Sequence, residues 1–167
     1  TPVTKTSPAG GAIAIPAGAP VVTASGVAGP YPAAITVGGL PASGVRVKSV
    51  QLNGLNHTWP SDLDILLQAP NGSHVILMSD RGGSTDIINA NLVFDDAALI
   101  DLPNTAITSG TYRPTNVAAP DNFTAPGPGA VNQINPRLAN FSGNFNGDWK
   151  LYIVDQFSGD VGSISSW

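Results

Sequence analysis

Two aspartates, Asp62 and Asp64, stand one residue apart in the stretch "HTWPSDLDILLQAPNG" at residues 57–72. In a β-strand, side chains two positions apart point to the same side, and their Cα atoms are about 7 Å apart. Carboxyl groups at such a spacing could approach the arrangement of the acid pair of a glycoside hydrolase. A catalytic pair must line a cleft that binds a sugar, however, and no group of inward aromatic residues indicates one. We therefore do not expect an active site here.

Aspartates at strand ends and in the adjoining loops suggest a second chemistry, a calcium site. Calcium binds several oxygen ligands at short range, and carboxylates supply them. The spacing of these aspartates matches no EF-hand loop, so only folding could bring them together. The candidate calcium ligands are Asp62, Asp64, Asp80, Asp86, Asp95 and Asp96.

Asp62 also has a purely structural interpretation. An aspartate beside serine and proline at the start of a strand commonly accepts hydrogen bonds from its own turn. The stretch "PSD" at residues 60–62 fits that description. A role in the scaffold and a role in metal binding are therefore both open for this residue.

The other reactive side chains give no sign of catalysis. The chain has no cysteine and only two histidines, His57 and His74, so a triad or a zinc site would need one of them. There is no G-x-S-x-G motif, and neither histidine has a second one at zinc spacing. The stretch "SDRGGSTD" at 79–86 lacks the lysine and the following helix of a phosphate loop. We expect no catalytic residue, and no cofactor other than calcium.

Composition favours an all-β fold in a single domain. The chain has 167 residues, long enough to bury about two-thirds of the surface that its unfolded form exposes. Glycine and proline are abundant, at 19 and 15 residues, and all 11 acidic residues are aspartate, so good helix formers are scarce. The net charge is −4 with seven scattered basic residues, which makes nucleic acid an unexpected partner.

The N-terminal segment 1–28 reads as a low-complexity arm or linker with one edge strand, "AIAIPAG". Its apolar run is interrupted by Pro16 and Pro20, so we expect no membrane span. The first residue is Thr1 rather than methionine, which would fit removal of a signal peptide or an excerpt from a longer chain. We expect an extracellular or cell-surface location.

Short strands and turns follow from residue 29 onward. The clearest is a hairpin, in which "DLDILLQA" and "HVILMS" flank "PNG", with Pro70 first in the turn and Gly72 in the left-handed conformation. In "VRVKSVQL" the apolar phase changes, which predicts a β-bulge near Lys48 and Ser49. Residues 95–145 show little periodicity and predict either a binding loop or a loosely ordered segment. Further strands are expected at "NLVF", "DWKLYIVD" and "VGSISSW".

Four segments in this order resemble the P-domain (P/Homo B domain) of kexin- and furin-like proprotein convertases, and most closely its versions on bacterial secreted proteins. They are "LNHTWPSDLDILLQAPNGSHVILMSDRGG", "LVFDDAA", "SGTYRPTN" and "FNGDWKLYIVDQFSGDVGSISSW". The resemblance covers residues 12–167 and implies a β-sandwich of jelly-roll type across residues 29–167. It also implies an accessory module that packs against a subtilisin-like protease and contributes to its folding, stability and calcium response. In the family the counterpart of Asp64 is often missing, which marks Asp64 as the more specific candidate ligand.

The chain departs from that family setting at two points. No segment resembles the aspartate, histidine and serine signatures of subtilisin-like proteases, so the resemblance implies that this chain is not an enzyme. Family members usually continue past the final tryptophan with a short strand, whereas this chain stops at Trp167. An unfilled strand position would leave backbone groups that invite a strand from another chain.

The leading hypothesis is a non-catalytic extracellular module that stabilises or tethers a protein partner, such as a secreted subtilisin-like protease. One alternative is a structural subunit of an extracellular fibre or surface layer, which would assemble with copies of itself by β-strand addition. A second alternative is a carbohydrate- or surface-binding module, by analogy with other jelly rolls.

Overall fold

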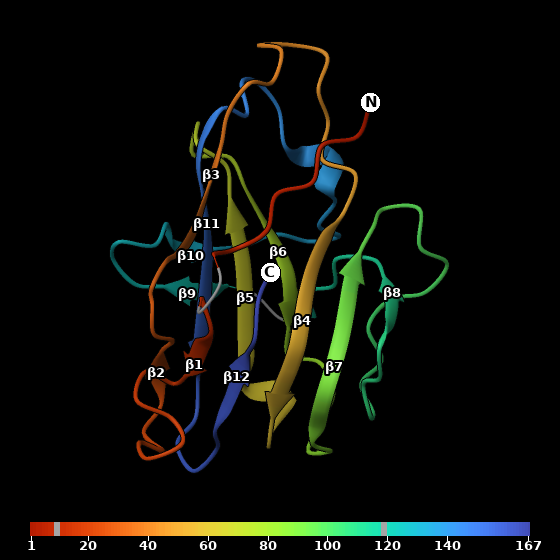
Figure 1. Ribbon diagram of the computed structural model, residues 1–167. Coiled ribbons are helices and arrows are strands. Elements are labelled where there is room, and N and C mark those ends of the chain that lie inside the picture. The colour runs from red at the N-terminus through yellow and green to blue at the C-terminus, as the bar shows by residue number, and fades with distance from the viewer. Residues whose placement is uncertain (9–10, 118–119) are drawn as a thin grey trace.

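The structure, a computed structural model, describes residues 1–8, 11–117 and 120–167 (Figure 1). In these ranges the regular elements are twelve β-strands and two short 3-10 helices, η1 (Pro60–Asp62) and η2 (Leu138–Asn140), with no α-helix. The all-β prediction is therefore confirmed. Among the described residues, no helix has the length and apolar character needed to cross a membrane.

The first of two five-stranded sheets has the order β1-β12-β4-β7-β8. Its pairs are antiparallel except for β7 and β8, which run parallel. The central pair β4–β7 contains the longest strands of this sheet. The bounds are β1 (Ile13–Ile15), β12 (Gly162–Ile164), β4 (Val50–His57), β7 (Ile87–Phe94) and β8 (Gly110–Tyr112).

The second sheet is built around β11, which pairs with β5 on one side and with both β2 and β3 on the other. Strand β6 follows β5 at the far edge. All of these pairs are antiparallel. The bounds are β2 (Gly26–Val27), β3 (Ala33–Val37), β11 (Gly147–Asp155), β5 (Leu63–Gln68) and β6 (His74–Ser79).

The two sheets share one hydrophobic core, as expected for a β-sandwich. Alternate residues of β5, among them Ile65, point into this core together with Leu52 of β4 and Leu92 of β7. Trp149, Leu151 and Ile153, at alternate positions of β11, belong to the same core. The jelly-roll connectivity of the strands stays a prediction.

A small third layer covers the outer face of the second sheet. It is the hairpin of β9 (Asp121–Phe123) and β10 (Gly129–Val131), seen beside β11 in Figure 1. Phe123 of this hairpin is completely buried against Leu66 and Tyr152, which lie on the outer face of β5 and β11. A second, smaller hydrophobic core therefore lies over the outer face of β5. The expected long loop 95–145 contains this hairpin together with β8 and η2.

The predicted hairpin between β5 and β6 is confirmed. The Ala69 N–H donates to the Ser73 carbonyl at 2.8 Å, which leaves the three residues "PNG" as the loop. Gly72 has a φ of +87°, the left-handed conformation that glycine adopts without strain.

The predicted bulge at Lys48 and Ser49 is wrong. Residues 45–49 are not in a strand, because β4 begins only at Val50. The register of β4 against β7 instead shifts between Leu52 and His57, where Gly54 has a φ of +62° and donates its N–H to Asn91 Oδ1. The alternation of apolar residues changes between Val47 and Val50 because β4 begins at Val50, and not because the strand is irregular there.

Part of the N-terminal arm belongs to the sandwich. Strand β1 pairs with β12 at the edge of the first sheet, and Ile13 and Ile15 are buried in the common core. Ala14 between them also forms a bridge with Gly29. The "AIAIPAG" strand is thus paired within its own chain.

Candidate metal centre

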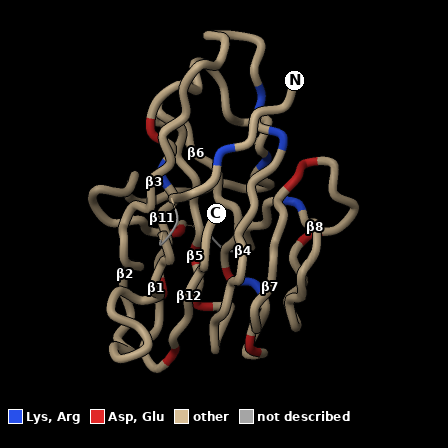
Figure 2. Tube along the Cα trace, viewed as in Figure 1, with Lys and Arg blue, Asp and Glu red and all other residues tan. Residues whose placement is uncertain are grey.

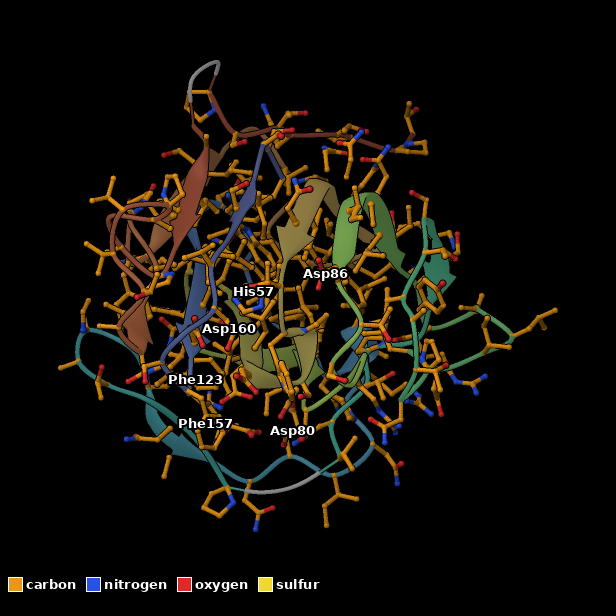
Figure 3. The ribbon with its side chains drawn as sticks, turned by 90° about the horizontal axis from the view of Figure 1, so that it is seen from below. His57, Asp80, Asp86, Phe123, Phe157 and Asp160 are labelled. Carbon is orange, nitrogen blue, oxygen red and sulfur yellow. The ribbon has the colours of Figure 1, made fainter. Side chains whose placement is uncertain are left out.

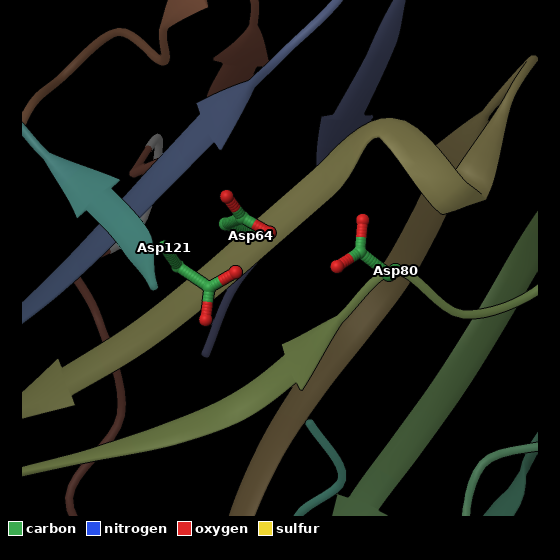
Figure 4. A group of neighbouring side chains, drawn as sticks. All are labelled: Asp64, Asp80 and Asp121. Carbon is green, nitrogen blue, oxygen red and sulfur yellow. The ribbon is translucent and has the colours of Figure 1, made fainter. Parts of the chain in front are cut away.

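Three aspartates converge between the outer face of the second sheet and the β9–β10 hairpin (Figure 4). Asp64 is the second residue of β5, and strand alternation turns it away from the main core. Asp80 directly follows β6 and Asp121 begins β9. Each contributes one carboxylate oxygen to a set whose members all lie within 4.8 Å of one another. Figure 4 shows the three carboxylates facing one space.

Two oxygens in this cluster are buried without a hydrogen-bond partner. Asp64 is 1% exposed and Asp121 is 3% exposed. Oδ2 of Asp64 accepts a hydrogen bond from the amide of Gln156, and Oδ1 of Asp121 accepts one from the Ser79 hydroxyl at 2.8 Å. Asp64 Oδ1 and Asp121 Oδ2 have no donor within the described part of the chain. Buried oxygens of this kind are rare and costly unless a donor or a cation satisfies them.

The cluster places negative charges close together in a poorly solvated site. The pKa of Asp64 is raised to about 7, mainly by burial; the hydrogen bond from Gln156 opposes the rise, and the charges of Asp121 and Asp80 add to it. Burial also raises the pKa of Asp121, and the charge of Asp80 adds to this effect. A bound cation would reverse both effects, because it stabilises the ionised carboxylates.

The geometry fits one metal ion held by oxygen. Two oxygens on opposite sides of one calcium ion are about 5 Å apart, since each metal–oxygen distance is about 2.3–2.6 Å. The 4.8 Å limit on the three oxygens is compatible with a shared ion. Carboxylates without histidine or cysteine suit hard cations and not zinc. The cluster could therefore hold a metal ion.

Of the six candidates from the sequence, the structure brings Asp64 and Asp80 together. Asp95 instead forms an ion pair with Lys48, and Asp96 accepts the backbone N–H groups of Leu138 and Ala139 at the start of η2. The remaining two candidates lie outside the three-residue cluster: one at the end of η1, and the other in the exposed segment before β7. They are Asp62 and Asp86. Calcium binding by any of the six stays a prediction.

Asp121 is the member of the cluster that the sequence did not indicate. It lies in "APDNF", inside the stretch 95–145 with little periodicity, so no local pattern linked it to β5 or β6. Its proximity to Asp64 depends on the hairpin packing over the outer face of the sheet. The one usable signal was an isolated aspartate at the start of a short alternating run that ends in a buried Phe123.

His57 and Asp155 form a second buried polar pair, in the main core. Nε2 of His57 lies 3.5 Å from Oδ2 of Asp155, and both side chains are fully buried. The Trp59 N–H donates to Nδ1 of His57 at 3.2 Å, which places the ring proton of neutral histidine on Nε2, facing Asp155. Both side chains are closed to solvent, and they come from strands of different sheets. The pair is therefore suited to a structural role, in which it connects the end of β4 with the end of β11.

Charge is unevenly distributed over the molecule. In Figure 2 most lysines and arginines lie in the upper half of the view, whereas aspartates predominate at the lower end. The pKa of Asp62 at this end is raised by burial and then by the charges of Asp160 and Asp155.

No protein-family model matches the sequence, and a search of the curated proteins finds no match either.

Proposed function

We propose that the chain is a calcium-binding, non-catalytic extracellular module of the P-domain type that stabilises or tethers a protein partner such as a secreted subtilisin-like protease. The observation that carries the calcium part is the pair of buried, unpartnered oxygens on Asp64 and Asp121 beside Asp80. The accessory role is supported by the ordered motifs given above and by the inaccessibility of the His57–Asp155 pair.

Calcium is the best candidate ion for this cluster. The side chains available in it are carboxylates from three separate segments, and calcium accepts irregular sets of oxygens, whereas magnesium demands near-ideal octahedral geometry. Three ionised carboxylates also supply the negative charge that raises affinity for a divalent cation. Water could complete the coordination on the exposed side of Asp80.

A bound ion would crosslink the fold. It would join β5, the end of β6 and the β9–β10 hairpin, which are distant in sequence. In a chain without cysteine, such a link does what a disulfide does elsewhere, because it favours the folded over the unfolded state. An ordered hairpin on this face would in turn give a partner a fixed surface.

Thermal unfolding of the purified chain tests the site. Excess calcium should raise the melting temperature relative to chelator, corresponding to about 2.7 kcal/mol when calcium is present at a hundred times its Kd. Asp64→Asn and Asp121→Asn should abolish this response. At pH 8 in chelator, each should be at least as stable as the wild type, because it removes a repelled charge.

Asp86→Asn is the matched control, since it removes the same charge from an exposed residue outside the cluster. It should keep the full calcium response. An identical melting curve with calcium and with chelator in the wild type would refute the site.

The accessory role has a separate test. The chain would be co-expressed with a subtilisin-like catalytic domain from which its own P-domain has been removed. We expect a complex and a longer half-life of the protease activity. Absence of a complex, or casein hydrolysis by the purified chain that a single point mutation abolishes, would contradict the proposal.

One observation supports carbohydrate binding as a second candidate. Two exposed aromatic side chains, Trp59 and Phe157, and two carboxylates, Asp62 and Asp160, line an open hollow of about 380 Å³. Phe157 and Asp160 are labelled in Figure 3, which views this end of the sandwich. An aromatic face and nearby hydrogen-bond acceptors can together bind a sugar ring. A glycan array with the wild type and Phe157→Ala would test it, and a wild type that binds no glycan would exclude it.

A further inference from the structure

Three of the seven basic residues of the chain line one groove. The groove has a volume of about 160 Å³ and is lined by the segment after β6 and by those around Arg113 and Arg137. Arg81 completes the set of three arginines, and Asp101 is the single acidic residue in the lining. The groove therefore carries two excess positive charges in a chain whose net charge is −4.

The arginines are only partly satisfied by the protein. Arg113 donates from Nε to Asp101 at 2.7 Å and from Nη1 to the Ala98 carbonyl at 3.0 Å. Arg137 donates from Nη1 to the carbonyl of Pro136 at 2.8 Å. The Nε of Arg81 is buried and has no acceptor among the described residues. Within the same part of the chain, neither Arg81 nor Arg137 has a carboxylate within ion-pair distance.

A buried guanidinium nitrogen without an acceptor is costly, so the protein leaves the Arg81 side chain incompletely satisfied. The guanidinium groups that line the groove are available to an anion bound there. The planar guanidinium group donates two parallel hydrogen bonds to the oxygens of phosphate-like and carboxylate groups. One arginine can bind a planar carboxylate through two parallel hydrogen bonds. Three arginines lining one groove match the several oxygens of a tetrahedral anion better.

The size of the groove limits the ligand. Pockets for drug-sized molecules have volumes of about 300–1,000 Å³, so 160 Å³ accommodates a single small group and not a whole sugar or nucleotide. We propose that this groove binds a tetrahedral oxyanion, sulfate or phosphate, either as the free ion or as an ester group on a larger molecule.

The groove adjoins the metal centre, but its lining does not include Asp64, Asp80 or Asp121. Arg81 follows Asp80 in the chain, and Thr115 in the groove lining pairs with Ser79, whose N–H donates to the Thr115 carbonyl at 3.0 Å. The oxyanion site needs no metal ion. Binding is therefore to be measured both with calcium and with chelator, and the phosphate measurements are restricted to chelator because calcium phosphate precipitates.

Isothermal titration of the full chain with sodium sulfate, and with sodium phosphate in chelator, tests the proposal against sodium chloride at equal ionic strength. We expect saturable one-to-one binding of sulfate and phosphate. Arg81→Gln and Arg137→Gln should each weaken it about tenfold or more, because each removes charge-assisted hydrogen bonds. Lys5→Gln, which removes an exposed cation outside the groove, should leave the affinity unchanged.

Glucose 6-sulfate and glucose 6-phosphate distinguish the two sources. Tighter binding of an ester than of the inorganic ion indicates an ester group on a larger molecule, and weaker binding indicates the free ion. If Arg81→Gln fails to fold by circular dichroism, Arg137→Gln carries the test. No saturable sulfate or phosphate binding, or an equal loss in Lys5→Gln, would overturn the proposal. Loss of calcium binding alone would leave it standing.

Discussion

The hydroxyl of Ser79 donates a hydrogen bond of 2.8 Å to Oδ1 of Asp121, so the last residue of β6 is tied to the first residue of β9. The same hydroxyl lies 3.1 Å from Oδ2 of Asp80. A hydroxyl has one proton, so it cannot fully satisfy both carboxylates. The centre thus contains more acceptors than donors, which is the condition that favours a cation.

Removal of this hydroxyl should destabilise the protein. Ser79→Ala leaves Asp121 Oδ1 buried without its donor, at a cost of about 1–3 kcal/mol in the free energy of unfolding. Urea unfolding in chelator measures the effect. Ser84→Ala, at an exposed position in the next loop, is the control and should change stability by less than about 0.5 kcal/mol. Equal stability of the two variants would contradict the role of the bond.

The metal-free protein should lose stability as the pH rises toward neutrality. The pKa of Asp64 is about 7 in the folded protein, and about 3.9 is usual for an unfolded chain. The folded state therefore holds this proton more tightly, so the stabilisation is complete below about pH 4 and is lost as the pH rises through about 7.

Urea unfolding in chelator at about pH 5 and about pH 7.5 measures this loss, which spans the window between the two pKa values. We expect a larger decrease in the wild type than in Asp64→Asn, which cannot ionise. Calcium affinity should change in the opposite sense and rise with pH, because the ion binds the deprotonated carboxylate. Parallel pH curves for the two proteins would show that Asp64 does not titrate in this range.

The buried His57–Asp155 pair should matter for stability. His57→Ala leaves Asp155 Oδ2 buried without its neighbour and also creates a cavity, so we expect a loss of about 3 kcal/mol or more in the free energy of unfolding. His74→Ala, at the more exposed start of β6, should cost about 1 kcal/mol or less. Comparable losses for the two histidines would argue against a special role of the pair.

Strands β12 and β4 approach too closely at Gly162 to accept a side chain. A Cβ there would lie against the backbone carbonyl of Asn56, far inside van der Waals contact. Gly162→Ala should therefore destabilise the sheet by about 3 kcal/mol. Gly38→Ala is the matched control, because a Cβ at Gly38 meets no atom within 4 Å. A difference of less than about 0.5 kcal/mol in urea unfolding would contradict the expected clash.

Local patterns in the sequence were sufficient for the all-β class and for the β5–β6 hairpin. The turn "PNG" depends on Pro70 and Gly72 themselves, and the alternation in β11 depends on adjacent residues. The bulge was misplaced because an apolar phase change looks the same at a strand's start as within it. Only the pairing of β4 with β7 located the irregularity between Leu52 and His57.

The amino-acid composition limits the available chemistry to aspartate carboxylates and two isolated histidines, with no thiolate. Which of these carboxylates come together depends on the folded arrangement of the strands. Asp64 faces outward through strand alternation, but its neighbour Asp121 comes from a distant hairpin that packs there through Phe123. The same holds for the groove of Arg81, Arg113 and Arg137. Contacts between distant segments arise from the packing of whole layers, which no spacing along the chain encodes.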